Sequence, residues 1–259
     1  MIRQSILLCS IAIALSGCAT DRGPREAEIP GIRERVSRKD MPRLKPVGDP
    51  TRVAATDIAF ARMARDQGQW TAFAEYSAPG AQLHGRNGPI EARPWLAAQQ
   101  NPPVSVRWAP TAVWSSCDGS LAVSFGRSLD PEGIVGSYAT VWQLQDDRTY
   151  RWIYDGGTPD NPQPPPRPAD VVADKDTIVV DALTAIDGRV ADCPRGGGEL
   201  PAARIPILEE GTREGGGESA DRTLNWRWEH QADGTRRVVV RWLRDGAWQQ
   251  ALDFSMAPQ

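Results

Sequence analysis

The chain has 259 residues, a formal net charge of −3 and 40% hydrophobic residues. A length of this kind suits one large domain or two small ones. Because the chain is net negative, we expect no nucleic-acid partner. The two histidines and four cysteines include no pair at metal-ligand spacing, so we expect neither a metal site nor a cofactor.

The first 17 residues are typical of an export signal. Arg3 supplies a positive start, and residues 6–15 form an apolar segment too short for an ordinary membrane span. The segment ends in Leu15-Ser16-Gly17-Cys18, which resembles the lipobox of bacterial lipoproteins. The resemblance implies cleavage before Cys18, a diacylglyceryl group on its sulfur and acylation, for example with palmitate, of the new amino terminus. The alternative is an ordinary signal peptide in which a cysteine happens to follow Gly17.

Lipidation at Cys18 would anchor the protein in the bilayer of the bacterial cell envelope, facing the periplasm. Ala19 follows the cysteine. It is not the aspartate linked to inner-membrane retention in enterobacterial lipoproteins, so we expect the outer membrane. Residues 18–48 are rich in Arg, Lys, Glu and Pro, with little apolar periodicity, and we expect a tether. In an oxidising compartment Cys117 and Cys193 either pair in a disulfide or remain two buried thiols.

Residues 49–158 are predicted to form the first folded domain. Asp49 as N-cap, Pro50 in the first turn and Gly68 as terminator predict a helix over residues 50–67. The pattern also predicts helices and strands in the order helix 70–76, strand 81–84, helix 89–100 and strands 104–114, 121–128, 134–145 and 150–155. Helices followed by an antiparallel meander predict an α+β fold, with about three helices on one face of a curved sheet.

Asp57 departs from the pattern of the first helix. It lies in the middle of the apolar face that Val53, Phe60 and Ala64 form at helical spacing. A carboxylate in that position must find a partner, remain protonated or face a cavity. Any functional interpretation of the domain therefore depends on Asp57.

Four short runs in this domain carry a family resemblance. They are Asp57-Ile-Ala-Phe60, Gly68-x-x-x-Ala72-Phe73-x-x-Tyr76, Tyr138-x-x-Val141-Trp142 and Arg151-Trp152-Ile153-Tyr154-Asp155-Gly156-Gly157. Over residues 50–158 the chain resembles the SnoaL-like branch of the nuclear transport factor 2-like superfamily. The resemblance implies a cone, in which a bent antiparallel sheet wraps round helices and leaves a pocket at the open end. The superfamily includes ketosteroid isomerase, limonene epoxide hydrolase, dehydratases and noncatalytic members, and its members often dimerise through the sheet.

The candidate pocket residues are Asp57, Tyr76, Tyr138, Trp142 and Asp155. An isomerase needs a carboxylate base opposite acids that donate to an oxyanion, and an epoxide hydrolase needs an Asp–Arg–Asp relay. Residue spacing places neither arrangement. An ion pair with Arg93 or Arg151 explains Asp57 more simply than catalysis does. His84 lies beside the turn at residues 85–88, where we expect it to be exposed.

A second part of the chain follows a proline-rich segment. Residues 159–168 contain six prolines, which predict a semi-rigid linker and a domain 50–158 that folds without the tail. Residues 169–259 are predicted to form a small, mostly β module with strands 176–183, 224–230, 236–244 and 247–254. We expect the glycine-rich stretches 194–198 and 211–217 to be loops, and no internal repeat is evident.

These features predict a lipid-anchored, noncatalytic envelope protein that binds a small molecule or an envelope partner. The alternative is an isomerase, dehydratase or hydrolase with a small apolar substrate, acting through Asp57 and a tyrosine. The nature of the pocket distinguishes the two hypotheses. A deep cavity with an unpaired carboxylate and a tyrosine within hydrogen-bond reach favours catalysis, and a filled cone with Asp57 in an ion pair favours binding.

Replacing Cys18 by serine should leave the chain unprocessed and without lipid, because serine lacks the thiol that accepts the diacylglyceryl group. Metabolic labelling with a palmitate analogue measures the difference between the wild type and Cys18→Ser. Equal label on both proteins would contradict the lipobox interpretation.

Overall fold

The computed structural model describes residues 47–165, 185–194, 200–201 and 208–258. The expected signal, the tether up to residue 46 and the expected strand 176–183 lie outside these residues. In the part of the chain that is described, no helix is long and apolar enough to cross a membrane.

Three helices precede and interrupt the first strands. Helix α1 (Pro50–Gln67) begins as expected, since the Asp49 carboxylate accepts a hydrogen bond from the Thr51 amide at 2.9 Å. It ends at Gly68, whose φ of 109° favours glycine. Helix α2 spans Gln69–Tyr76 and α3 spans Ala92–Ala97. The third helix is shorter than predicted, because residues at its expected start form strand β2 (Gly88–Glu91) and pair with β1 (Ser77–Gly85).

A seven-stranded sheet forms the centre of the fold. Its remaining strands are β3 (Arg107–Ser115), β4 (Leu121–Leu129), β5 (Val135–Leu144), β6 (Tyr150–Pro159) and β7 (Asp187–Val190). The order is β2-β1-β6-β5-β4-β3-β7. The predicted antiparallel meander is present in β3 to β6, whereas the pairs β1–β6 and β3–β7 are parallel. The α+β class and a sheet packed on helices are thus confirmed, and shifts of register in β1, β3 and β5 are the kind of irregularity that bends a sheet.

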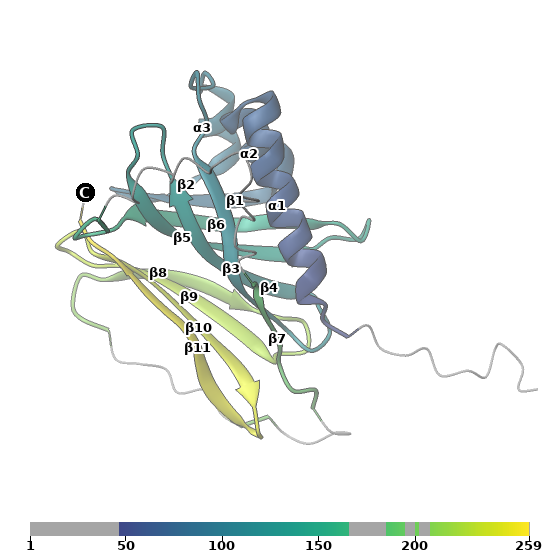
Figure 1. The fold of residues 1–259 in the computed structure, drawn as a ribbon. Helices are drawn as coiled ribbons and strands as arrows, with labels where there is room; N and C mark the ends of the chain where they lie inside the picture. The colour runs from purple at the N-terminus through teal and green to yellow at the C-terminus, as the bar shows by residue number, and fades with distance from the viewer. Residues whose placement is uncertain (1–46, 166–184, 195–199, 202–207, 259) are drawn as a thin grey trace, which may run out of the picture. The chain divides into compact units, whose positions relative to one another are not determined.

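The helices cover one face of this sheet, as Figure 1 shows. Phe60 of α1 is 1% exposed, and its ring centroid lies 4.7 Å from that of Phe73 and 4.8 Å from that of Trp108. Trp142 and Trp152 of the sheet are fully buried in the same cluster. The apolar face predicted for α1 is therefore the face that contacts the sheet.

A second, four-stranded antiparallel sheet covers the other face (Figure 1). It contains β8 (Arg213–Glu218), β9 (Leu224–His230), β10 (Arg236–Arg244) and β11 (Ala247–Met256). The prediction of a glycine-rich loop at 211–217 is wrong for most of its length, since β8 pairs with β9 there. Gly215 is needed because a Cβ at this position would lie 2.7 Å from the Trp228 ring.

The two sheets share one hydrophobic core. Tryptophans and aliphatic residues of the second sheet pack against the outer face of the first, including Trp226, Trp228, Val238, Val240 and Trp242 against Trp114, Leu121, Val123, Val141 and Tyr154. Strand β7, which belongs to the predicted C-terminal module, also pairs directly with β3 in the larger sheet. The outer sheet face, which the family resemblance suggests for a possible homodimer, is thus covered by the chain's own strands.

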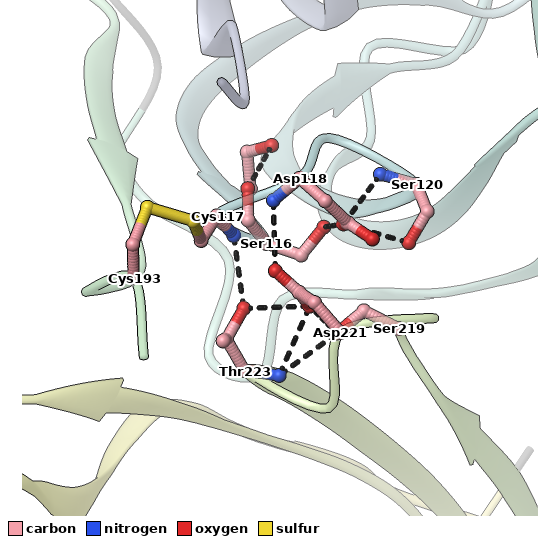
Figure 2. The surroundings of a disulfide bond; sticks show 9 residues. Ser116, Cys117, Asp118, Ser120, Cys193, Ser219, Asp221 and Thr223 are labelled. Carbon is pink, nitrogen blue, oxygen red and sulfur yellow. Dashed lines mark hydrogen bonds between the residues drawn. A yellow bond between two sulfur atoms is a disulfide. The ribbon is translucent and has the colours of Figure 1, made fainter. Parts of the chain in front are cut away.

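A disulfide joins Cys117, in the turn between β3 and β4, to Cys193, just beyond β7 (Figure 2). The two Cα atoms are 5.1 Å apart, and the residues are 76 positions apart in sequence. The cross-link fixes the segment after β7 to the turn between β3 and β4.

The turn at Cys117 has a counterpart in the turn between β8 and β9 (Figure 2). Residues 116–121 and 219–224 share the pattern Ser-x-Asp-x-Ser/Thr-Leu. In both, the serine hydroxyl donates to the aspartate at 2.7 Å, and the leucine amide donates to the serine oxygen. The contacts between the turns are reciprocal, because the Cys117 amide donates to Thr223 Oγ1 and the Ala220 amide donates to Ser120 Oγ, each at 2.9 Å. We expected no internal repeat, but this short one, which has three identical positions, joins the two sheets.

The shared core reverses our expectation for the isolated fragment 50–158. Without the second sheet this fragment exposes a face that carries Trp114, Leu121 and Val141, so we expect a poorly dispersed amide NMR spectrum and strong binding of a hydrophobic dye. The control is the chain from residue 19 to 259 in the same buffer. A well-dispersed spectrum of the fragment would show that the smaller sheet is not required for folding.

Candidate functional site

A partly open pocket with a volume of about 150 Å³ lies between the helices and the inner face of the larger sheet. Its wall is mainly aromatic and apolar, with a few polar groups, and consists of Phe60, Gln69, Phe73, Val106, Trp108, Ser128, Tyr138 and Asp155. Two of the five expected pocket residues, Tyr138 and Asp155, therefore line it.

Asp57 is completely buried beside this pocket, behind two of its wall residues. Its carboxylate accepts hydrogen bonds from Trp108 Nε1 and from the Tyr138 hydroxyl, each at 3.0 Å. Burial raises the pKa of Asp57 to about 6, and hydrogen bonds from neighbouring side chains oppose this rise. Because Asp57 does not itself line the pocket, its role is to position Trp108 and Tyr138, which do.

The expected ion pair of Asp57 with Arg93 or Arg151 is not formed. Arg93 donates to the Ser77 carbonyl at 2.9 Å, and Arg151 donates to the carbonyl of Glu75. Both guanidinium groups therefore bind backbone oxygens at the ends of helices and strands. Asp57 instead has neutral donors, which compensate a buried charge less completely than a cation does.

Asp155 is the carboxyl group that faces the pocket. The register of β5 and β6 places Thr140 directly opposite, and its hydroxyl donates to Asp155 Oδ2 at 2.6 Å. Burial raises the pKa of Asp155 to about 7; the Thr140 hydrogen bond opposes this, and the like charge of Asp57 adds to it. Asp155 thus exchanges a proton close to neutral pH.

Tyr138 is the third member of this group. Burial raises its pKa well above the ordinary value, and the charges of Asp57 and Asp155 add to the effect. The phenol therefore stays protonated and donates to Asp57. Buried Asp57 and Tyr138 thus lie beside Asp155, which is half-buried and faces the partly open pocket.

The other candidates lie outside the pocket. Trp142 is buried in the core, where its Nε1 donates to Ser124 Oγ at 2.9 Å. The Tyr76 ring packs against Phe60 at 5.1 Å between centroids. The prediction that His84 is exposed is wrong, since only 4% of it is accessible and it contacts Tyr154 and His230.

Sequence reasoning also missed Thr140 and Trp108. Thr140 shares a strand face with Tyr138 and Trp142 at a period of two, a signal that could have identified it. Nothing comparable identifies Trp108, because its contact with Asp57 spans 51 residues. Across the described ranges, no group of three or more His, Cys, Asp or Glu side chains could hold a metal ion.

Comparison with known proteins finds related folds only among solved structures. No family model matches the sequence. No curated protein matches it. A proposed ketosteroid isomerase from Parabacteroides distasonis is 16% identical with a TM-score of 0.36, and the match covers 46% of this chain and 98% of that chain. An NTF2-like protein of unknown function from Mesorhizobium loti is 15% identical with a TM-score of 0.30, covering 44% and 96% of the two chains. At these identities the likeness concerns the fold alone.

Replacing Asp57 by asparagine should stabilise the protein at neutral pH. A carboxyl whose pKa is raised on folding binds more protons in the folded state, so its unfavourable contribution grows as pH rises from the unfolded pKa through about 6. Asparagine removes the charge, can accept from Trp108, and can donate to Tyr138. We expect a gain of about 1–3 kcal/mol at pH 7.5 and a smaller gain at pH 5, measured by urea unfolding.

The matched control is Asp66→Asn on the same helix, where the carboxylate is exposed and paired with Arg65. This change should alter stability by less than about 0.5 kcal/mol at either pH. A large loss of stability for Asp57→Asn at pH 7.5 would contradict the assignment of Asp57 as a carboxylate whose burial is only partly compensated.

Proposed function

We propose that the protein binds a small, mainly apolar molecule in this pocket and that Asp155 contacts the polar group of that molecule. The observation that carries the proposal is the carboxyl of Asp155 in the wall of a mainly aromatic and apolar cavity, where burial raises its pKa to about 7. An apolar pocket with a small number of placed polar groups is the usual design of a small-molecule site.

The size of the pocket limits the ligand. An apolar cavity of about 150 Å³ accommodates benzene in another protein, so this pocket suits a single ring. Phe60, Phe73 and Trp108 supply flat apolar surfaces for such a ring. A protonated Asp155 would donate to a carbonyl or hydroxyl oxygen on the ring, and an ionised one would accept from a hydroxyl.

A second candidate function is catalysis of proton transfer on such a molecule. It is favoured by the pKa of Asp155, since a general acid or base works best when its pKa is close to the operating pH. Tyr138 and Asp57 would assist. When Asp57 takes up a proton it can donate to the phenol oxygen, and the Tyr138 proton is then free for the substrate. A tyrosine within hydrogen-bond reach of a carboxylate that has no ion-pair partner is part of the arrangement that we expected to favour catalysis.

We also propose that the protein is held in the bacterial envelope through lipid on Cys18. The run Leu15-Ser16-Gly17-Cys18 at the end of an apolar segment supports this location, as does the polar composition of residues 18–48. The pocket would then act on molecules that reach the periplasm, and an envelope protein remains a second class of partner.

Binding can be tested with phenol and cyclohexanone as probes in an amide NMR titration. We expect shift changes grouped at Trp108, Tyr138 and Asp155, with cyclohexanone binding at least threefold more tightly at pH 6 than at pH 8, because only a protonated Asp155 donates to its carbonyl. Asp155→Asn should retain ring binding and lose this pH dependence.

Two further variants define the site. Ser128→Phe places a ring in the cavity and should abolish binding, whereas Tyr76→Phe lies outside the cavity and should leave binding unchanged. If neither probe shifts these residues, or if Ser128→Phe binds as the wild type does, the pocket is not a ligand site. Hydrogen exchange from the α-carbon of bound cyclohexanone, lost in Asp155→Asn, would indicate catalysis as well as binding.

A further inference from the structure

Basic side chains gather between the β1–β2 hairpin and one end of the four-stranded sheet. Strand register places Arg213, His230 and Arg236 in one row across β8, β9 and β10, where cross-strand partners share a face. His84 of β1 meets this row, since its Nε2 lies 3.0 Å from His230 Nδ1 and its carbonyl accepts from Arg236 Nη1 at 2.8 Å. We refer to these four residues as the basic cluster.

Arg236 is the least compensated member of the basic cluster. The residue is 2% exposed, yet its Nε and Nη2 have no hydrogen-bond partner among the residues that the structure describes. Within the described ranges, no carboxylate forms an ion pair with Arg236 or with Arg213. A buried guanidinium stays charged, and leaving it unpaired is strongly unfavourable.

The opposite face of the same sheet shows how this protein normally compensates an arginine. Arg237, next to Arg236 in β10, forms ion pairs with Asp253 and Glu229, and Arg227 pairs with Glu229. Carboxylates are thus available to this sheet, but among the described residues of β8 to β11 none lies on the face that carries the basic cluster. Arg236 therefore requires negative charge from a source other than these strands.

The histidines of the basic cluster add donors and no negative charge. If the Tyr154 hydroxyl donates to His84 Nδ1, at 2.7 Å, then His84 Nε2 donates to His230 Nδ1 and the His230 Nε2 proton remains as a further donor. Burial and the charges of Arg236 and Arg213 lower the pKa of both imidazoles. Asp233 is the acidic group that interacts with His230 among the described residues, and it is occupied by the amide and hydroxyl of Thr235.

We propose that the basic cluster binds one small monovalent anion of the chloride class, with Arg236 as its main donor. Arg236 supplies N–H groups on Nε and Nη2 that are unused among the described residues, and Arg213, whose Nη2 donates to the Asn87 carbonyl at 2.8 Å, adds a second positive charge from the edge strand. The ligand must be small, because Met256, the cross-strand partner of Arg236, is buried, as is Trp228, whose ring centroid lies 5.3 Å from that of His84. A bound anion would hold the β1–β2 hairpin to the four-stranded sheet, at a place separate from the pocket of Asp155.

The first test is a series of thermal melts in which chloride replaces gluconate at constant ionic strength. The wild type should show a melting temperature that rises with chloride and then saturates, by several degrees in total. Arg236→Met keeps the length of the side chain without its charge and should lose this response. Arg237→Met, on the opposite face of the same strand, should retain it. No response in the wild type, or an equal response in Arg236→Met, would overturn the proposal.

A second test uses only the wild type and so does not depend on folding of the variants. The sequence contains two histidines, His84 and His230, so their imidazole NMR signals can be followed separately. A bound anion favours the charged imidazolium, and the pKa of His230 should therefore be higher in chloride than in gluconate at equal ionic strength. Identical titrations in the two salts would overturn the proposal. A response to sulfate but not to chloride would show that the site takes a different class of anion.

Discussion

The buried carboxylate of Asp57 is the constraint on which the helix–sheet arrangement depends. It lies on the apolar face of α1 and is held by hydrogen bonds from Trp108 on β3 and Tyr138 on β5. These two donors can meet one carboxylate only if α1 lies across the inner face of the sheet at a fixed depth. The same contacts turn Trp108 and Tyr138 into walls of a pocket, and the charge of Asp57 helps to keep the pKa of Asp155 near neutrality. One polar residue in an apolar pattern thus links the fold to the chemistry of the site.

The second constraint is that the large sheet is buried on both faces. Helices cover one side and the chain's own four-stranded sheet covers the other, with a common tryptophan-rich core. The two matched serine–aspartate turns fasten the second sheet to the first, and the disulfide fixes the segment after β7 to the first of these turns. A further contact between the two sheets joins His84 Nε2 on β1 to His230 Nδ1 on β9, at 3.0 Å. The outer face of the large sheet, which could otherwise bind a second molecule, is therefore covered by strands of the same chain.

The sequence predicts much of the fold and only part of the site. Helix α1 and strands β4, β9 and β10 have local signals, namely caps, alternation and turn residues, so their bounds agree with the structure. The sequence singles out Asp57 because a carboxylate breaks the apolar periodicity of the helix. It does not single out Trp108 and Tyr138 as the partners, because tryptophan and tyrosine count as apolar residues in a strand pattern. His84 was misplaced because a contact 146 residues away leaves no local trace. Strand β8 was missed because its glycines, which allow close approach to Trp228, are also typical of loops.

The central claim is that two neighbouring carboxyl groups in the pocket region change protonation near neutral pH. Carbon-13 NMR of the aspartate carboxyl groups, followed from pH 3 to pH 9 in the wild type, measures this directly. The account predicts that Asp155 titrates near pH 7 and Asp57 near pH 6, with each titration affecting the signal of the other. Titration of both groups below about pH 4, as for ordinary exposed or ion-paired aspartates, would contradict it.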